Sequence, residues 1–148
     1  MVKYETLIHR TSMPKTFTTK RQKIGKLGEQ VATRFLMKHN HKILDQNYTR
    51  PWGEIDIVSC EKSATGNILH FIEVKSLKVT DLNLMDTSYN PAENLHYRKR
   101  LRMAKTIKTY LWASKIPENQ PYQVDLIIVY LDLKRLKSRL KVVNQIIL

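Results

Sequence analysis

The stretch Val124–Tyr130 is the sequence feature that most restricts the possible folds of this chain. It is apolar apart from Asp125 and has the length of a strand, whereas a helix that spans a membrane needs about 20 apolar residues. A strand without regular polar alternation is covered on both faces of its sheet. The sequence therefore predicts an α/β fold in which Val124–Tyr130 is a central strand.

The other expected elements follow from hydrophobic periodicity and turn composition. Apolar residues at helical spacing predict a first helix from Ile24 to about His39. Two segments with turn composition, Arg50–Gly53 and Ser63–Asn67, then separate three short β-like runs, as in an antiparallel meander. The three runs are Lys42–Thr49, Glu54–Cys60 and Ile68–Ser76.

A second helix and a last strand complete the expected order. Asn90 as N-cap, Pro91 at the first helical position and Glu93 in the first turn predict a helix toward Lys115. Leu140–Ile147 is a weaker terminal strand. The order is αβββαβ plus this strand, a mixed central sheet flanked by helices, in one domain over residues 23–148. Residues 1–22 lack periodicity and are basic, which predicts a flexible N-terminal arm.

The charge of the chain indicates a polyanionic partner. The 148 residues contain 26 Lys and Arg but 13 Asp and Glu, a net charge of +13. Such an excess opposes compaction, and nucleic acid is its usual partner, although attachment to a ribosome explains it equally well. Acids are concentrated between residues 45 and 93, and both flanking regions are basic. This distribution is typical of a metal site inside a phosphate-binding surface.

The single cysteine and the lack of long apolar stretches restrict the location. Cys60 cannot form a disulfide within the chain or a zinc site built from cysteines. We find no signal peptide and no apolar stretch long enough to cross a bilayer. We therefore expect a cytoplasmic protein that does not enter a membrane.

Two acids and a lysine on adjacent strands form the sharpest chemical pattern. Side chains alternate along a strand, so Glu73 and Lys75 point to the same face. If the strand of Asp56 pairs with theirs, Asp56 and Glu73 supply two oxygen ligands for a divalent cation such as Mg²⁺ or Mn²⁺. Lys75 then places a positive charge beside a scissile phosphate. Glu-x-Lys by itself is more often a solvated pair that keeps an edge strand soluble.

The longer pattern resembles the YraN-like proteins in motif order and spacing. That family is similar to the PD-(D/E)XK nucleases, so the resemblance implies the restriction-endonuclease-like fold. The motifs that carry the resemblance are Gly25–Ala32, Ile43-Leu44, Asn47-Tyr48, Gly53–Asp56, Phe71–Lys75, Lys99 ahead of Tyr110-Leu111, and Val124-Asp125. Two segments depart from the family pattern, Ser76-Leu77 after Glu-x-Lys and Thr87–Asn90 before the second helix.

The resemblance also assigns roles to residues. It implies Glu29 as the acid of the first helix, Asp56 and Glu73 as metal ligands and Lys75 as the catalytic lysine. It implies Lys99 as a further polar position on the second helix. Without the family, Glu29 is a solvated residue that favours the helix dipole.

The second helix has a basic face. Arg98, Arg102 and Lys105 recur at helical spacing without an interleaved acid, and Lys99 lies beside them. Like charges at these spacings cost a few tenths of a kcal/mol per pair, and a bound phosphate backbone reverses that cost. A solvated basic face is the alternative. Together with the basic arm and the basic C-terminal run, this face predicts nucleic-acid binding.

The patterns around the histidines and Asp125 are less specific. His39 and His41 lie at a helix end with spacing that separates their rings, so we interpret them as solvated. His70 has no partner spacing. Asp125 interrupts an apolar strand, so it must be hydrogen-bonded or lie near a cleft, and we favour a structural role.

We expect a restriction-endonuclease-like domain that binds nucleic acid, DNA rather than RNA, and hydrolyses phosphodiesters as a structure-specific, Mg²⁺- or Mn²⁺-dependent endonuclease. A non-catalytic nucleic-acid or ribosome-associated binding module is the alternative, and a structural partner in a larger assembly is the third interpretation. Cleavage of a symmetric junction requires two sites and hence a homodimer.

Overall fold

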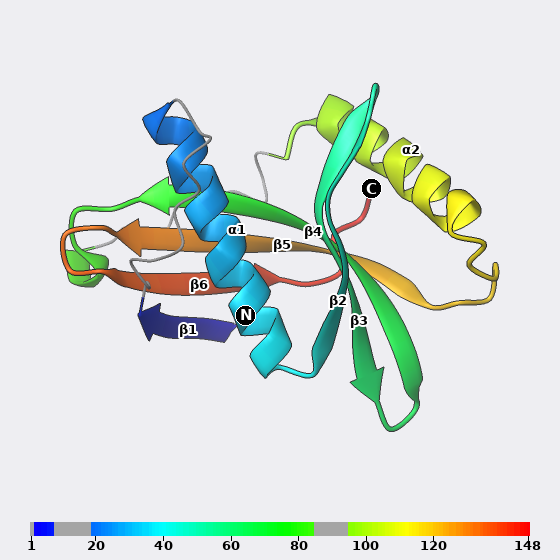
Figure 1. The fold of residues 1–148 in the computed structure, drawn as a ribbon, viewed down its shortest axis with the longest axis horizontal. Helices are drawn as coiled ribbons and strands as arrows, with labels where there is room; N and C mark the ends of the chain where they lie inside the picture. Colours follow the sequence, from blue (N-terminus) through cyan, green and yellow to red (C-terminus); the bar gives the residue numbers. More distant parts are fainter. Residues whose placement is uncertain (1, 8–18, 85–94) are drawn as a thin grey trace.

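The chain folds into an α/β structure around a mixed sheet. A computed structural model describes residues 2–7, 19–84 and 95–148. The sheet has six strands in the order β1-β6-β5-β4-β3-β2 (Figure 1). In chain order the elements are β1 (Val2–Leu7), α1 (Lys20–Lys38), β2 (His41–Arg50), β3 (Gly53–Ser63), β4 (Gly66–Lys78), the 3-10 helix η2 (Leu82–Leu84), α2 (Tyr97–Ala113), β5 (Tyr122–Asp132) and β6 (Lys137–Val143). This architecture confirms the predicted αβββαβ order and is compatible with a restriction-endonuclease-like core.

Strand β5 is a central strand, as its apolar sequence predicts. It pairs in parallel with β4 and antiparallel with β6. Ile127 and Val129 pack in the cluster that includes α1, whereas Leu126 and Ile128 pack with Leu82 of η2. Both faces of β5 are therefore covered, which explains the near absence of polar alternation in its sequence.

The two long helices cover opposite faces of the sheet. Ile72 of β4 packs in the cluster of α1, and its neighbour Phe71 packs in the cluster of α2. Successive strand residues point to opposite faces, so these two contacts place the helices on opposite sides. Figure 1 shows α1 crossing one face, and α2 beside the twisted end formed by β2, β3 and β4.

Helix α1 begins earlier than its apolar periodicity predicts. Thr19 is the N-cap: its hydroxyl oxygen accepts from the Gln22 amide nitrogen, and the Gln22 side-chain oxygen accepts from the Thr19 amide nitrogen, both at 3.2 Å. This capping box satisfies two donors of the first turn. The predicted start at Ile24 is therefore wrong, because the first turn is stabilised by capping rather than by apolar contacts.

The N-terminal segment is not a free arm over all of residues 1–22. Val2–Leu7 form strand β1, which pairs antiparallel with β6 from Val2↔Val142 to Leu7↔Lys137. The first turn of α1 also lies within this segment. Pairing with β6 satisfies backbone groups of a sheet edge, a distant interaction that local periodicity cannot reveal. Residues 8–18 lie outside the described residues.

The start of the second helix and the end of the last strand also differ from the prediction. Asn90, Pro91 and Glu93, the predicted start of the second helix, lie outside the described residues, and α2 begins at Tyr97 after His96 as N-cap. Strand β6 ends at Val143 instead of near Ile147. Beyond it, the amide nitrogen of Ile146 donates to the Val124 carbonyl oxygen at 2.8 Å. Among the described helices, none combines the length and apolar content needed to cross a membrane.

The close contact between α1 and β4 requires glycine at position 28. A Cβ atom there would lie 1.7 Å from Ser76 Oγ and 2.8 Å from Ser76 Cβ, so rotation of the hydroxyl cannot relieve the clash. We predict that Gly28→Ala lowers the free energy of unfolding by about 1–3 kcal/mol, the usual cost of overpacking. Urea unfolding followed by circular dichroism measures the change.

Gly25 provides the matched control on the same helix. A Cβ atom at Gly25 meets nothing within 4 Å. Gly25→Ala should therefore raise the free energy of unfolding by about 0.5–1 kcal/mol through helix propensity alone. Equal shifts in the two variants would contradict the close approach of α1 to β4.

Candidate functional site

Asp56 lies where the pairing between β3 and β4 ends. The recorded register of the two strands stops at Ile57↔Ile72. Beyond this point a side chain, instead of a backbone carbonyl of β3, accepts the hydrogen bond: the Val74 amide nitrogen donates to Asp56 Oδ2 at 2.7 Å. This hydrogen bond holds the Asp56 carboxylate over β4, next to Glu73.

Glu73 is a buried acid with one oxygen paired. Only 7% of the residue is exposed. The Lys99 ammonium of α2 donates to Glu73 Oε1. Glu73 Oε2 is buried and has no hydrogen-bond partner among the described residues. Burying a carboxylate oxygen without a partner costs free energy, and a further cation bound to this oxygen would offset that cost.

Burial raises the pKa values of both acids. Burial raises the pKa of Asp56 to about 8; the negative charge of Glu73 adds to the rise, and the hydrogen bond from Val74 opposes it. Burial likewise raises the pKa of Glu73, although the positive charge of Lys99 pulls it down. Without a further cation, the pair therefore retains a proton that ordinary carboxylates lose.

Glu29 and Lys75 complete the set that the sequence predicts. Glu29 is half-buried on α1, 3.4 Å from Lys26 Nζ through Oε2, and its negative charge contributes to the raised pKa of Asp56. Lys75 is half-buried two residues after Glu73, on the same face of β4. No ion pair involves Lys75 within the described ranges. The fold thus gathers Glu29, Asp56 and Glu73, with Lys75 beside them on β4.

Asn47 ties the Glu29 region of α1 to β2. In the amide orientation that satisfies both of its neighbours, Asn47 donates to Glu29 Oε2 and accepts from Lys26 Nζ, each at 3.2 Å. Asn47 has φ of 53°, in the left-handed region that asparagine tolerates well. The Asn47-Tyr48 motif therefore has a structural role at the edge of the site.

The donor set fits a hard divalent cation. Asp56 and Glu73 offer carboxylate oxygens, the ligand type that Mg²⁺ and Mn²⁺ prefer. The unpaired Glu73 Oε2 and the raised pKa values of both acids indicate that the buried negative charge is only partly compensated by the protein. Lys99 supplies part of that charge, through Glu73 Oε1.

A cavity of about 440 Å³ lies between the β2–β3 turn and α2, and Lys99, the partner of Glu73, is part of its lining. Its lining includes Arg50, Glu54, Lys99 and Arg102. Gly53 permits this arrangement, because a Cβ atom there would lie 2.8 Å from the Thr106 hydroxyl oxygen. The glycine of the Gly53–Asp56 motif therefore lets α2 approach the strand that carries Asp56.

The predicted basic face of α2 divides into two parts. Arg98, Arg102 and Lys105 are exposed. Lys105 also places Nζ 4.5 Å from the centroid of the Trp52 ring. Lys99 instead faces Glu73. Sequence reasoning placed Lys99 with the nucleic-acid ligands and missed its pairing with Glu73, since the two residues are 26 positions apart and no local pattern links them.

Comparison with known proteins assigns the chain to a family. A model described as "Uncharacterised protein family UPF0102" matches residues 28–129. The chain belongs to the UPF0102 family. A UPF0102 protein of Caldanaerobacter subterraneus is 32% identical over 124 residues, which cover 84% of this chain and 91% of the relative. Relatives from Campylobacter lari (36%; 73% and 84% covered) and Clostridium acetobutylicum (35%; 75% and 82% covered) carry the same family name.

The UPF0102 match agrees with the resemblance to YraN-like proteins. The matched residues include Glu29, Asp56, Glu73, Lys75 and Lys99, and so span the whole carboxylate site. The family description states no activity. The chemistry of the site therefore has to come from its geometry.

The raised pKa of Asp56 predicts a dependence of stability on pH. A carboxyl group whose pKa is higher in the folded state stabilises the fold below its unfolded value, and that stabilisation is lost as pH rises through the folded value. In EDTA, the wild type should lose stability between about pH 4 and pH 8, with a slope of at most about 1.4 kcal/mol per pH unit for one proton. Urea unfolding across this range measures it.

Asp56→Asn is the corresponding control, because its amide cannot ionise. The variant should have a flatter profile and exceed the wild type in stability at pH 8. A variant profile parallel to that of the wild type would contradict the assigned protonation of the pair.

Proposed function

We propose that this UPF0102 protein is a nucleic-acid-binding phosphodiesterase, a structure-specific DNA endonuclease that uses Mg²⁺ or Mn²⁺. The observation that carries the proposal is the pair of buried carboxylates, Asp56 and Glu73, whose second acid retains an unpaired oxygen. Resemblance to the PD-(D/E)XK nucleases supports the same site. We expect this activity in the cytoplasm.

The residues have separate roles in the proposed reaction. Asp56 and Glu73 would hold the cation, which when bound supplies a polarised phosphate oxygen and an activated water for hydrolysis. Lys75 stabilises the negative charge that develops on the phosphate, as a compact ammonium at the site edge does. The negative charge of Glu29 lowers the electrostatic potential at Asp56, which favours the binding of a cation there.

Substrate binding is assigned to the exposed face of α2. Arg98, Arg102 and Lys105 supply positive charge beside the cavity that Lys99 and Arg102 line. Phosphate contacts of this kind position a duplex without reading its sequence. A structure-specific substrate is consistent with this, because branched DNA is recognised by the arrangement of its phosphates.

One observation favours a second candidate function. The Lys99 ammonium neutralises Glu73 through Oε1, so a cation is already present beside the acids. A nuclease scaffold that has lost its metal would be stable in this state and would act as a nucleic-acid or ribosome-associated binding module. A screen of branched, single-stranded and duplex DNA and RNA with Mg²⁺, Mn²⁺ or EDTA distinguishes the two: metal-dependent cleavage supports the endonuclease, and binding without cleavage supports the module.

Replacing the proposed metal ligands and replacing the lysine should have different effects on DNA binding. Asp56→Asn and Glu73→Gln should each lower cleavage at least about 100-fold, while DNA binding in EDTA stays equal, or becomes tighter where the replaced carboxyl is ionised and repels the phosphate. Lys75→Ala should also lose cleavage but should bind DNA slightly more weakly, by about 1 kcal/mol or less. Single-turnover cleavage and fluorescence anisotropy measure the two effects.

Calorimetry with Mn²⁺ separates the two classes of variant further. The carboxylate variants should lose the Mn²⁺ site, and Lys75→Ala should keep it. Wild-type turnover in Asp56→Asn would show that the site is assigned wrongly.

DNA affinity should depend steeply on salt. If about five phosphates are contacted, log affinity falls against log salt with a slope of about −4.5, so fourfold more salt weakens binding about 500-fold. Replacing Arg98, Arg102 and Lys105 by alanine should flatten the slope to about −1.8, since about two contacts remain. Anisotropy titrations at several salt concentrations give the slopes.

A charge-matched control uses three exposed lysines at the opposite end of β3. Alanine at Lys38, Lys42 and Lys62 also removes three positive charges, away from the carboxylate site. This variant should retain nearly the wild-type slope. Equal flattening in both triple variants would mean that net charge, rather than the α2 face, determines binding.

A further inference from the structure

A second polar cluster lies at the other end of the same strands. His41 begins β2, Glu61 is near the end of β3, and His70 lies in β4. His41 pairs with Glu61 across β2 and β3, and Ser59 pairs with His70 across β3 and β4. One potential ligand atom from each of the two histidines and Glu61 lies within 4.8 Å of the others. The fold therefore brings two imidazoles and a carboxylate together from three adjacent strands.

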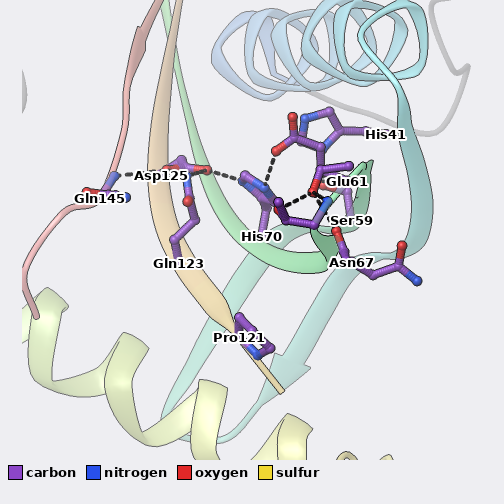
Figure 2. Close-up of polar contacts among 12 residues, drawn as sticks. His41, Ser59, Glu61, Asn67, His70, Pro121, Gln123, Asp125 and Gln145 are labelled. Atoms are coloured by element: carbon purple, nitrogen blue, oxygen red, sulfur yellow. Dashed lines mark hydrogen bonds and ion pairs between the residues drawn. The ribbon is translucent and has the colours of Figure 1, made fainter. Parts of the chain in front are cut away.

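His70 is held in one orientation by a buried acid. Its Nδ1 lies 2.5 Å from Asp125 Oδ2, and its Nε2 lies 3.0 Å from Glu61 Oε2 (Figure 2). Asp125 is itself fixed, because Oδ1 accepts from Gln123 Nε2 at 2.9 Å and from the Gln145 amide nitrogen at 3.0 Å. His70 and Asp125 are 4% and 3% exposed. A carboxylate behind one ring nitrogen, with the other nitrogen facing outward, is the usual support of a metal-bound histidine.

His41 is supported in a similar way. Its Nδ1 lies 2.9 Å from the hydroxyl oxygen of Ser59, which is fully buried. Its ring packs edge-on against that of His70, with the centroids 4.6 Å apart. With Nδ1 engaged, Nε2 is the ring nitrogen that His41 can offer to a ligand. His41 thus has one nitrogen held by a neighbour and one available, whereas His70 has Nδ1 held by Asp125 and Nε2 directed at Glu61, the third proposed ligand.

The cluster opens onto space that a metal ion and its solvent ligand can use. A cavity of about 440 Å³ is lined by His41, Glu61, His70 and Asp125, among others. The Glu61 side chain is 38% exposed, so its carboxylate can adjust to a bound ion. The hydrogen bond between His70 Nε2 and Glu61 Oε2 holds a proton where a cation would bridge the same two atoms.

The ligand types indicate which ions fit. Imidazole suits zinc and the neighbouring transition metals, whereas Mg²⁺ takes oxygen ligands. Two histidines and one glutamate, with a fourth position left for water, form a known type of zinc site. The ordinary alternative is a buried ion-pair network. Such a network explains the contact between His70 and Asp125, but it does not explain why His41 and the cavity lie at the same place.

We propose that His41, Glu61 and His70 form a three-ligand site for a divalent transition-metal ion, with an open position toward the cavity. This site is separate from the Asp56–Glu73 pair: Glu61 is five residues further along β3, roughly 16 Å at the usual rise per residue. The proposal goes beyond the proposed nuclease function and does not depend on it.

Zinc titration of the full chain tests the site. Protein stripped with a chelator is titrated with ZnCl₂ by calorimetry in excess Mg²⁺, which would compete for the oxygen ligands of the carboxylate pair. One Zn²⁺ should bind per chain. His41→Ala and Glu61→Gln should weaken binding at least about 100-fold, and Ser59→Ala, which removes only a supporting hydrogen bond, by about 10–100-fold. Circular dichroism confirms that each variant is folded, and Co²⁺ substitution should give the intense visible bands of four-coordinate cobalt.

Two controls keep the test specific. His39→Ala alters another histidine of the same cavity and should leave the Zn²⁺ affinity unchanged. The double variant Asp56→Asn, Glu73→Gln should also retain it, whether or not the protein cleaves DNA. The proposal would be overturned if Glu61→Gln and His41→Ala fold and bind Zn²⁺ with wild-type affinity. It would also be overturned if the Asp56/Glu73 double variant lost Zn²⁺ binding while the His41 and Glu61 variants retained it.

Discussion

Parallel pairing of β4 with β5 is the constraint on which the rest of the structure depends. Parallel neighbours cannot be joined by a hairpin and need a crossover of a dozen or more residues. Here the crossover contains η2 and α2, and these two elements cover the face of the sheet opposite α1. The same crossover brings Lys99 to Glu73 and sets the basic face of α2 beside the carboxylates.

The buried carboxylate pair lowers the stability of the fold. Two acids buried together repel each other and lose hydration, and the protein compensates only in part, through the Val74 amide and Lys99. Elsewhere β3 and β4 bury apolar residues such as Ile57 and Phe71 in well-packed clusters. A costly polar pair within an otherwise apolar framework is typical of a site maintained for binding or chemistry.

The two polar sites on β3 and β4 differ in ligand chemistry. Near the start of β3, Asp56 joins Glu73 in a set of oxygens; near its end, Glu61 joins two imidazoles. Hard cations favour the first set and transition metals the second. Under the two proposals, one pair of strands presents two distinct cation environments, because its ends are flanked by different elements: α2 at the carboxylates, and β2 with the start of β5 at the histidines.

The sequence by itself determined the α/β class, the order of the elements from the first helix onward, the central position of Val124–Tyr130 and the placing of Asp56, Glu73 and Lys75 on neighbouring strands, because hydrophobic period and turn residues act locally. It predicted that Asp125 is hydrogen-bonded, which the contacts with His70 and Gln145 confirm. Only the tertiary structure decided that β1 pairs with β6, that Lys99 reaches Glu73, and that His41, expected to be solvated, meets His70 and Glu61. These contacts join residues far apart in the chain, and their partners are chosen by sheet register and the crossover rather than by any local pattern.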